Sequence, residues 1–341
     1  MHNNPSKMLF SSFIFMGSMI SLSSYSWMGV WMGLEINMLA FMPMLSNQKN
    51  ILMNETSIKY FIIQALASSM LIMSIILMNM KSSMYWMLNN NMMMLINLSL
   101  MLKIGMAPMH FWLPEVMGET NWMNCMLLMT WQKLAPLTVM SYYIKMNLII
   151  MTMVIMSAMI GAIGGLNQSS LRKMMAYSSI NHMGWMISTM MISEPLWELY
   201  FIIYSIMSTI TVMMMNQNKL IWLNQMFNSN NNNNLNKYLI YISLLSLGGL
   251  PPFLGFIPKW MSIQMMMENK MTFILTVLIM SSMITLYYYL RITMTSIIMV
   301  SEMNKWNIKT SQSIKNNWIM STMVTMSTIM MTMSPTILLI N

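Results

Sequence analysis

Charge is scarce in this sequence. Of its 341 residues only 7% are charged, whereas 57% are hydrophobic. Soluble domains carry about 25% charged residues, so this chain has too little charge to cover a surface that faces water. All eight acidic residues are glutamate, and aspartate is absent. These proportions exclude an intrinsically disordered chain and a coiled coil, and they indicate a polytopic membrane protein.

Cysteine is also nearly absent. The single Cys125 excludes a disulfide framework and a thiolate metal cluster. We find no catalytic triad, metal-ligand cluster or dinucleotide fingerprint, so we expect neither a metal nor a bound cofactor. The 59 methionines are spread along the apolar segments, which indicates packing rather than soft-metal binding.

Methionine, isoleucine and asparagine are in excess together. A/T-rich coding gives this composition when the codon usually read as isoleucine is read as methionine. Animal mitochondrial genes are decoded in that way. The composition therefore points to an organelle-encoded protein.

Apolar runs of bilayer length dominate the chain. A transmembrane helix needs about 20 mostly apolar residues, and about eleven such runs are present. We expect spans at 6–24, 26–45, 57–80, 90–111, 121–143, 147–166, 172–192, 195–216, 236–258, 271–297 and 317–339. The first run lacks a signal-peptide cleavage site and is expected to be retained. The sequence thus predicts an all-α membrane protein with one membrane domain over residues 1–341.

Basic residues in the loops predict the orientation. The side of the N-terminus carries Lys7, Lys49, Lys59, Arg172, Lys173, Lys219, Lys237, Arg291, Lys305, Lys309 and Lys315, and the other side carries Lys81, Lys145 and Lys270. By the positive-inside rule the N-terminus faces the matrix and the C-terminus the intermembrane space. Arg291, which follows three tyrosines, is expected to anchor at an aromatic belt. The bases form no stripe of the kind that binds nucleic acid, so nucleic acid is not an expected partner.

A motif recurs 144 residues along the chain. Glycine, proline, an aromatic residue and a second proline stand at Gly105, Pro108, Trp112 and Pro114, and again at Gly249, Pro252, Phe256 and Pro258. Proline interrupts helices, so each copy predicts a broken helix. We expect two inverted repeats of five spans, 6–143 and 147–297, followed by the last span. Paired broken helices of opposite direction point to a transport site at mid-membrane.

Four ionisable residues stand inside predicted spans: Glu35, Lys103, Lys133 and Lys259. Each costs at least about 2.5–3.5 kcal/mol to insert. An apolar environment disfavours a charged lysine and a nearby carboxylate favours it, so a lysine whose partner comes and goes can take up and release a proton. Proton conduction, with Glu35 and Lys103 as a switchable pair, is the resulting hypothesis. Lys259 as an interface lysine at a helix end, and Glu35 with Lys133 as a structural ion pair, are the alternatives.

Two histidines are further candidates for proton relay, because imidazole titrates near neutral pH. His110 would share a helical face with Lys103 if the helix continued to Pro108. His182 lies in a polar stretch of the seventh predicted span. The alternative for each histidine is a packed, hydrogen-bonded residue.

Four segments resemble a known family: residues 31–37, 102–114, 161–184 and 248–260. Together they are similar to the antiporter-like membrane subunits of respiratory complex I, and the likeness covers nearly the whole chain. The expected number of spans matches the animal form that lacks the first helices of the family.

The resemblance implies a translocase subunit that couples electron transfer from NADH to ubiquinone to proton pumping across the inner mitochondrial membrane. Glu35, Lys103, Lys133 and Lys259 fall on the proton path of that family. Flavin and iron–sulfur clusters are then expected on other subunits. Partners would be the other membrane-arm and accessory subunits and lipids such as cardiolipin. An autonomous cation/proton antiporter of the related multisubunit type and a non-conducting structural subunit are the alternatives.

Overall fold

The computed structural model of the protein describes residues 5–47, 50–79, 85–144, 146–228 and 234–300. Over these residues the chain forms fourteen helices and no strand, with one isolated bridge between Ser170 and Trp222. Six helices are long and apolar enough to cross a membrane, namely α1, α2, α3, α8, α10 and α14. The expected all-α membrane fold is confirmed.

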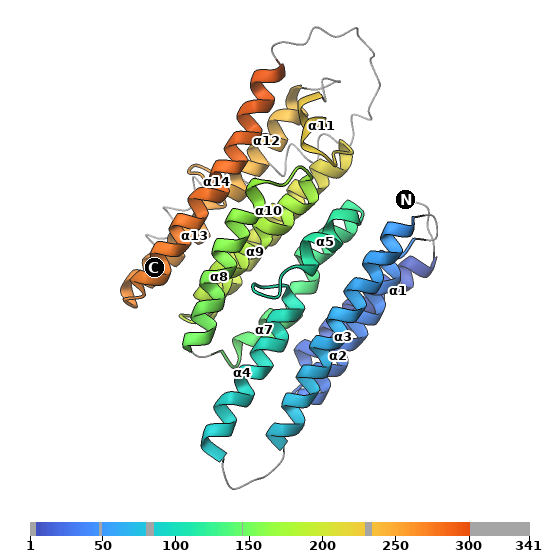
Figure 1. Ribbon diagram of the computed structural model, residues 1–341, viewed down its shortest axis with the longest axis vertical. Coiled ribbons are helices and arrows are strands. Elements are labelled where there is room, and N and C mark those ends of the chain that lie inside the picture. Colours follow the sequence, from blue (N-terminus) through green and yellow to red (C-terminus); the bar gives the residue numbers. More distant parts are fainter. Residues whose placement is uncertain (1–4, 48–49, 80–84, 145, 229–233, 301–341) are drawn as a thin grey trace. The chain divides into compact units, whose positions relative to one another are not determined.

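The chain divides into two units, and the first ends at Asn147. It contains α1 (Pro5–Ser23), α2 (Trp27–Leu45), α3 (Ile51–Asn79), α4 (Tyr85–Ile104), α5 (Trp112–Glu119), α6 (Trp122–Met129) and α7 (Trp131–Ser141). α2 packs against α1 and α3, and α3 packs against α4 and α5 (Figure 1). α7 contacts α1, α2 and α4, so it joins the hairpins of this unit.

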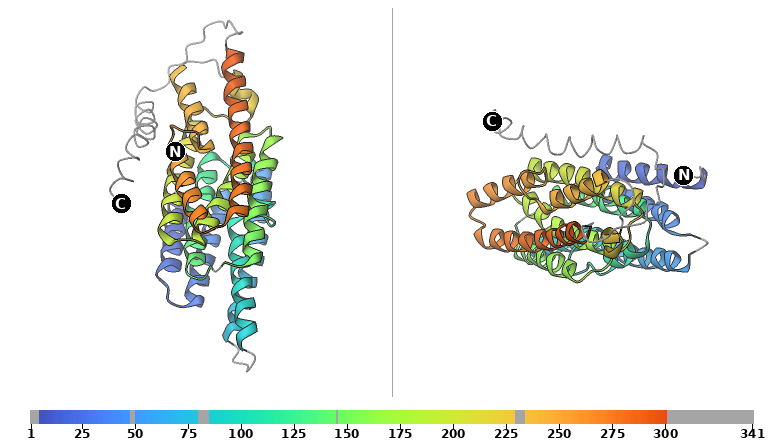
Figure 2. Two further views of the ribbon diagram at one scale, coloured as in Figure 1. Left: turned by 90° about the vertical axis from the view of Figure 1, so that its left-hand side faces the viewer. Right: turned by 90° about the horizontal axis from the view of Figure 1, so that it is seen from above.

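The second unit begins at Leu148. It contains α8 (Leu148–Leu166), α9 (Leu171–Met190), α10 (Glu194–Gln217), α11 (Leu223–Asn228), α12 (Asn234–Gly248), α13 (Phe256–Glu268) and α14 (Thr272–Val300). α9 packs against α8 and α10, and the long α14 runs along α8 and α12 (Figure 2). Most of α9 is buried, and its serine, asparagine and threonine side chains at Ser178, Ser179, Asn181, Ser188 and Thr189 therefore face other helices.

Glycine allows the first two helices of each unit to touch. A Cβ on Gly17 of α1 would lie 2.8 Å from the backbone nitrogen of Asn37 in α2. Gly161 of α8 has the same relation to Asn181 of α9, at 2.5 Å. Both pairs follow the 144-residue offset of the sequence motif. The inverted relation of the repeats 6–143 and 147–297 stays a prediction.

Several predicted spans differ from the helices found. The fourth, expected at 90–111, ends as a helix at Ile104, and the ninth, expected at 236–258, ends at Gly248. In both, a glycine with positive φ follows and stops the helix before the apolar run is over. The fifth, expected at 121–143, comprises α6 and α7. The last, expected at 317–339, lies outside the described residues.

Candidate functional site

The helix α4 ends in a hydrogen-bonded glycine cap. Gly105 has a φ of +81°, which glycine adopts without the clash that a Cβ would cause. Its N–H donates to the carbonyl of Leu102 at 3.2 Å, and the N–H of Met106 donates to the carbonyl of Met101 at 3.0 Å. These two bonds define a Schellman motif. The helix α4 therefore ends at a defined, hydrogen-bonded position of the backbone.

Two neutral side chains cover carbonyl groups at this helix end. The indole Nε1 of Trp112 donates to the carbonyl of Leu102 at 3.2 Å. The amide Nε2 of Gln64 on α3 donates to the carbonyl of Lys103 at 3.2 Å. A helix end inside a membrane needs such partners, because no bulk water is present to supply them. Both of these donors are neutral.

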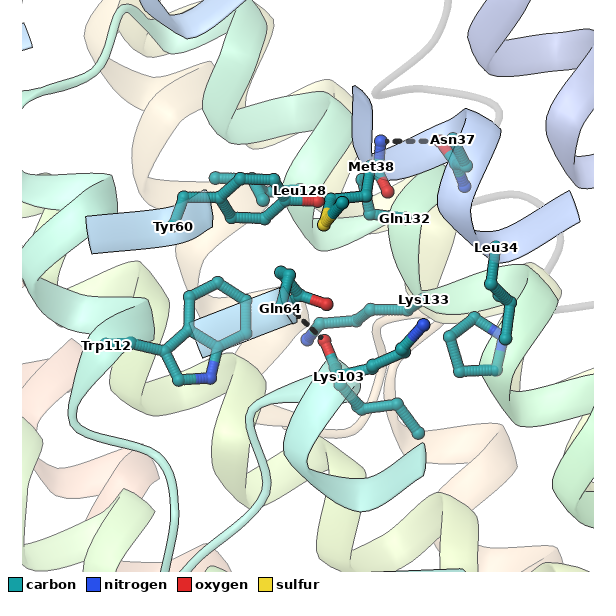
Figure 3. Close-up of a pocket in the computed structure, with 12 residues that line it drawn as sticks. Leu34, Asn37, Met38, Tyr60, Gln64, Lys103, Trp112, Leu128, Gln132 and Lys133 are labelled. Carbon is teal, nitrogen blue, oxygen red and sulfur yellow. Dashed lines mark hydrogen bonds between the residues drawn. The ribbon is translucent and has the colours of Figure 1, made fainter. Parts of the chain in front are cut away.

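Lys103 and Lys133 line one small cavity in the first unit (Figure 3). Lys103 is 7% exposed and Lys133 is 2% exposed. The cavity has a volume of about 20 Å³, enough for about one water molecule. Its polar lining also includes Asn37, Tyr60, Gln64 and Gln132. The fold therefore brings together two of the four ionisable residues that the sequence singles out.

Hydrogen bonds fix α7 beside this cavity. Gln132 Nε2 donates to Asn37 Oδ1 of α2 at 2.9 Å, as Figure 3 shows. Trp131 Nε1 donates to Ser18 Oγ of α1 at 3.1 Å. Both residues directly precede Lys133 in the chain, so these bonds set the rotation of α7 that directs Lys133 inward.

Glu35 lies on α2, half-buried and outside the cavity lining. Among the described residues Lys59 forms ion pairs with Glu55 and Glu115, whereas no salt bridge joins Glu35 to Lys103. Glu35 nevertheless lies within electrostatic range of Lys103. The switchable pair predicted for these two residues is therefore not in contact in this structure, and its role stays a prediction.

His110 lies in the segment between α4 and α5 and is buried. Its Nδ1 is 3.1 Å from the carbonyl oxygen of Pro108, and its ring lies 4.3 Å from that of Phe111. Because α4 ends at Ile104, the condition under which His110 would share a helical face with Lys103 is not met. His110 does not line the lysine cavity.

The second break, after α12, repeats the glycine cap of the first. Gly249 has a φ of +80°, and its N–H donates to the carbonyl of Ser246 at 3.0 Å. The covering donor here is charged. Lys259 of α13 is 7% exposed, and its Nζ donates to the carbonyl of Gly248 at 2.8 Å. The ammonium group thus lies at the C-terminal end of α12, where the helix dipole favours a cation.

His182 forms a polar cluster with two tyrosines in the second unit. Its Nδ1 lies 3.0 Å from Tyr200 Oη, and its ring centroid is 5.1 Å from that of Tyr204. These residues line a cavity of about 10 Å³ together with Pro258, which directly precedes Lys259. His182 is thus hydrogen-bonded, and it lies beside the helix that carries Lys259.

Comparison with known proteins gives the family. The family model described as NADH:quinone oxidoreductase/Mrp antiporter, TM matches residues 24–285. The NADH-ubiquinone oxidoreductase chain 2 of Locusta migratoria is 51% identical, over 90% of each chain. The chain belongs to the NADH-ubiquinone oxidoreductase chain 2 family. The family member of Anopheles gambiae is 47% identical to this chain, over 88% of this chain and 89% of the relative. The member of Lemur catta is 39% identical, over 96% of each chain.

Solved structures share the fold of this chain 2 family member. A chain of respiratory complex I from Thermus thermophilus matches with a TM-score of 0.81 at 19% identity, over 96% of this chain and 77% of that chain. A chain of the Mrp complex from Dietzia sp. DQ12-45-1b matches with a TM-score of 0.71 at 14% identity, over 89% of this chain and 61% of that chain. The resemblance that the sequence motifs indicate is confirmed.

Sequence reasoning missed several polar neighbours of the lysines and of His182 in this chain 2 family member. Tyr60 and Gln64 stand four residues apart on α3, and Tyr200 and Tyr204 do so on α10. Polar residues at this spacing in an apolar run share one helical face, and that signal was available in the sequence. Lys59, expected in a loop, lies inside α3.

Proposed function

We propose that this chain is a proton-translocating, antiporter-like subunit of the membrane arm of respiratory complex I, coupling electron transfer from NADH to ubiquinone to proton pumping. The observation that carries the proposal is that Lys103 and Lys133 are both buried and line the same cavity. Burying an ionisable side chain costs free energy. Proton relays in membranes typically contain such side chains, with neighbouring dipoles that offset part of this cost. The 51% identity to a chain 2 supports complex I as the assembly.

In the first unit the proton is exchanged between Lys103 and Lys133 across their shared cavity. The cavity has room for about one water, and a bridging water serves nearly as well as a direct hydrogen bond. The amides of Gln64 and Gln132 supply dipoles around it. Glu35 supplies negative charge within electrostatic range of the site.

In the second unit the relay residues are Lys259 and His182. The bond between His182 and Tyr200 joins two groups that both donate and accept protons. In the first unit, His110 is bonded to a backbone carbonyl through Nδ1, so the proton is exchanged at its Nε2. The proposed proton path thus consists of Glu35, Lys103, Lys133, Lys259, His110 and His182.

The proposal places the chain in the inner mitochondrial membrane, with the N-terminus in the matrix and the C-terminus in the intermembrane space. It assigns the flavin and iron–sulfur clusters to other subunits and no redox centre to this chain. Its partners are the neighbouring membrane-arm and accessory subunits, with lipids such as cardiolipin around them. The basic loops and the chain 2 relationship support these assignments.

The test uses the assembled complex in proteoliposomes with Lys133→Met. We expect fewer protons pumped per NADH oxidised, since the neutral side chain cannot hold a proton. Lys270→Met, which removes an exposed lysine from the turn before α14, is the matched control and should pump normally. Full stoichiometry in Lys133→Met would contradict the proposal. Sodium-driven proton exchange that persists without electron transfer would favour an autonomous antiporter instead.

A further inference from the structure

We propose that a cavity at one end of the second unit binds the phosphate headgroup of an anionic phospholipid. The cavity has a volume of about 540 Å³, within the range of ligand pockets. It lies where α8 ends and α9 begins, beside α11 and the second half of α14, all at the same end of the unit in Figure 1. Arg291, Gln168, Asn224, Trp222 and Tyr288 are among its lining residues.

This end of the unit is basic. Arg291 lines the cavity, Arg172 and Lys173 stand in the chain between the lining residues Ser169 and Met174, and Lys219 precedes the lining residue Trp222 by three positions. The acidic residues of the described part of this unit are Glu194, Glu198 and Glu268. All three belong to turns or helix ends at the opposite end, since α9 and α13 run away from the cavity. The separation of charge favours an anion at the cavity.

The start of α9 adds to this preference. A helix N-terminus carries partial positive charge and is usually balanced by an acidic residue. α9 has no acid in its first turn, and its first turn carries Arg172 and Lys173 instead. Cationic side chains and the positive end of a helix dipole both favour phosphate oxygens.

The wall of the cavity is pre-formed. The backbone N–H of Leu171 donates to the carbonyl of Ile221 at 2.9 Å, and that of Leu223 donates to the carbonyl of Ser169 at 3.1 Å. These bonds join the turn before α9 to the segment before α11. A ligand that enters therefore pays little ordering cost, because the two loops already hold each other.

Position in the membrane favours a lipid over a free phosphate. α14 starts at Thr272, two residues after Lys270, and Arg291 lies 19 residues into the helix, a rise of roughly 29 Å at about 1.5 Å per residue. That length matches the hydrocarbon thickness of about 30 Å, so Arg291 lies at one membrane surface. Trp222 is 51% exposed beside the cavity, and aromatic residues of this kind mark the headgroup level. Basic pockets between helices at such a surface suit anionic lipid headgroups.

The test is photo-crosslinking in the purified complex, reconstituted into phosphatidylcholine vesicles with a trace of phosphatidylglycerol that carries a photoreactive headgroup. We expect labelling of the peptides around Trp222 and Arg291. Arg291→Gln should lower this labelling about fivefold, because one basic residue near an anionic headgroup contributes about 1 kcal/mol. Lys270→Gln removes the same charge at the opposite end of α14 and should leave it unchanged.

The unmodified complex provides a second measurement, which holds even if Arg291→Gln fails to assemble. A phosphatidylcholine probe of the same design should label these peptides at least several-fold less. Equal labelling by the two probes, or the same loss in both variants, would overturn the proposal. Complete competition by millimolar inorganic phosphate would assign the site to free phosphate instead of a lipid.

Discussion

The two helix breaks of this protein share one backbone design. Gly105 and Gly249 both follow the last helical residue with a φ near +80°, at +81° and +80°. The peptide bonds before Pro108 and Pro252 are both cis. Each glycine donates its N–H to the carbonyl three residues earlier. Equal spacing of glycine and proline in the sequence thus produces equal geometry in two separate units.

The breaks differ in the donors that cover their carbonyl groups. Trp112 and Gln64, both neutral, serve at the first break, whereas the Lys259 ammonium serves at the second. At the first break the lysine stands within the helix itself, and its side chain goes to a cavity shared with Lys133. Lys259 therefore has a structural task in addition to its proposed chemical one, whereas Lys103 has the proposed chemical task alone.

Lys259→Met should have the largest effect, because it removes both tasks at once. The carbonyl of Gly248 loses its donor, and an unsatisfied buried polar group costs about 1–3 kcal/mol. We expect a lower thermal midpoint of the assembled complex and fewer protons pumped per electron. Differential scanning calorimetry and pH-dye measurements in proteoliposomes check these two outcomes. An unchanged thermal midpoint would show that Lys259 does not stabilise the second break.

Lys103→Met should reduce coupled proton pumping while leaving stability unchanged or raised. A buried charge is replaced by an apolar side chain of similar length, and such replacements are often neutral or stabilising. Loss of a positioned proton-transfer group lowers rates by about 100-fold or more. The same two measurements apply. If Lys103→Met and Lys259→Met destabilise the complex equally, the two breaks do not differ as we infer.

Glu35→Gln should have a smaller effect on pumping than Lys103→Met. Glu35 makes no ion pair with Lys103 among the described residues, so it acts at a distance. At an effective dielectric near 20 a non-contacting charge contributes about 1–2 kcal/mol, or about tenfold in rate. The rate of proton pumping at fixed NADH checks this. A loss as large as that of Lys103→Met would indicate that the pair closes during turnover.

Gln64→Met should affect stability alone, by about 1 kcal/mol. It removes the amide that donates to the carbonyl of Lys103 and keeps the length of the side chain. Because Trp112 still covers the neighbouring carbonyl, the loss should be smaller than for Lys259→Met. Thermal unfolding of the assembled complex is the measurement. A loss of pumping at normal stability would instead place Gln64 on the proton path.

The sequence predicts the lysines and the breaks, because each has a local signature. A charged residue in an apolar run and a glycine near proline are visible without knowledge of the fold. The donors at the breaks are not predictable in this way. Gln64 is 39 residues from Lys103, and only the packing of α3 on α4 brings them together. The helix ends at Ile104 and Gly248 were missed because the apolar runs continue past them.

The smallest effect is expected at Glu115, which occupies in the first motif the position of Lys259 in the second, 144 residues away. Glu115 pairs with Lys59 at 3.3 Å, and the two side chains are 58% and 44% exposed. Exposed ion pairs contribute little and are weakened by salt. Glu115→Gln should therefore lower the thermal midpoint less than the other variants, with pumping unchanged and no difference left at high salt. Lys59 also contacts Glu55 at 2.9 Å, so Glu55→Gln is the matched control for one lost partner. A pumping defect in Glu115→Gln alone would show that this position serves the proton path in both units.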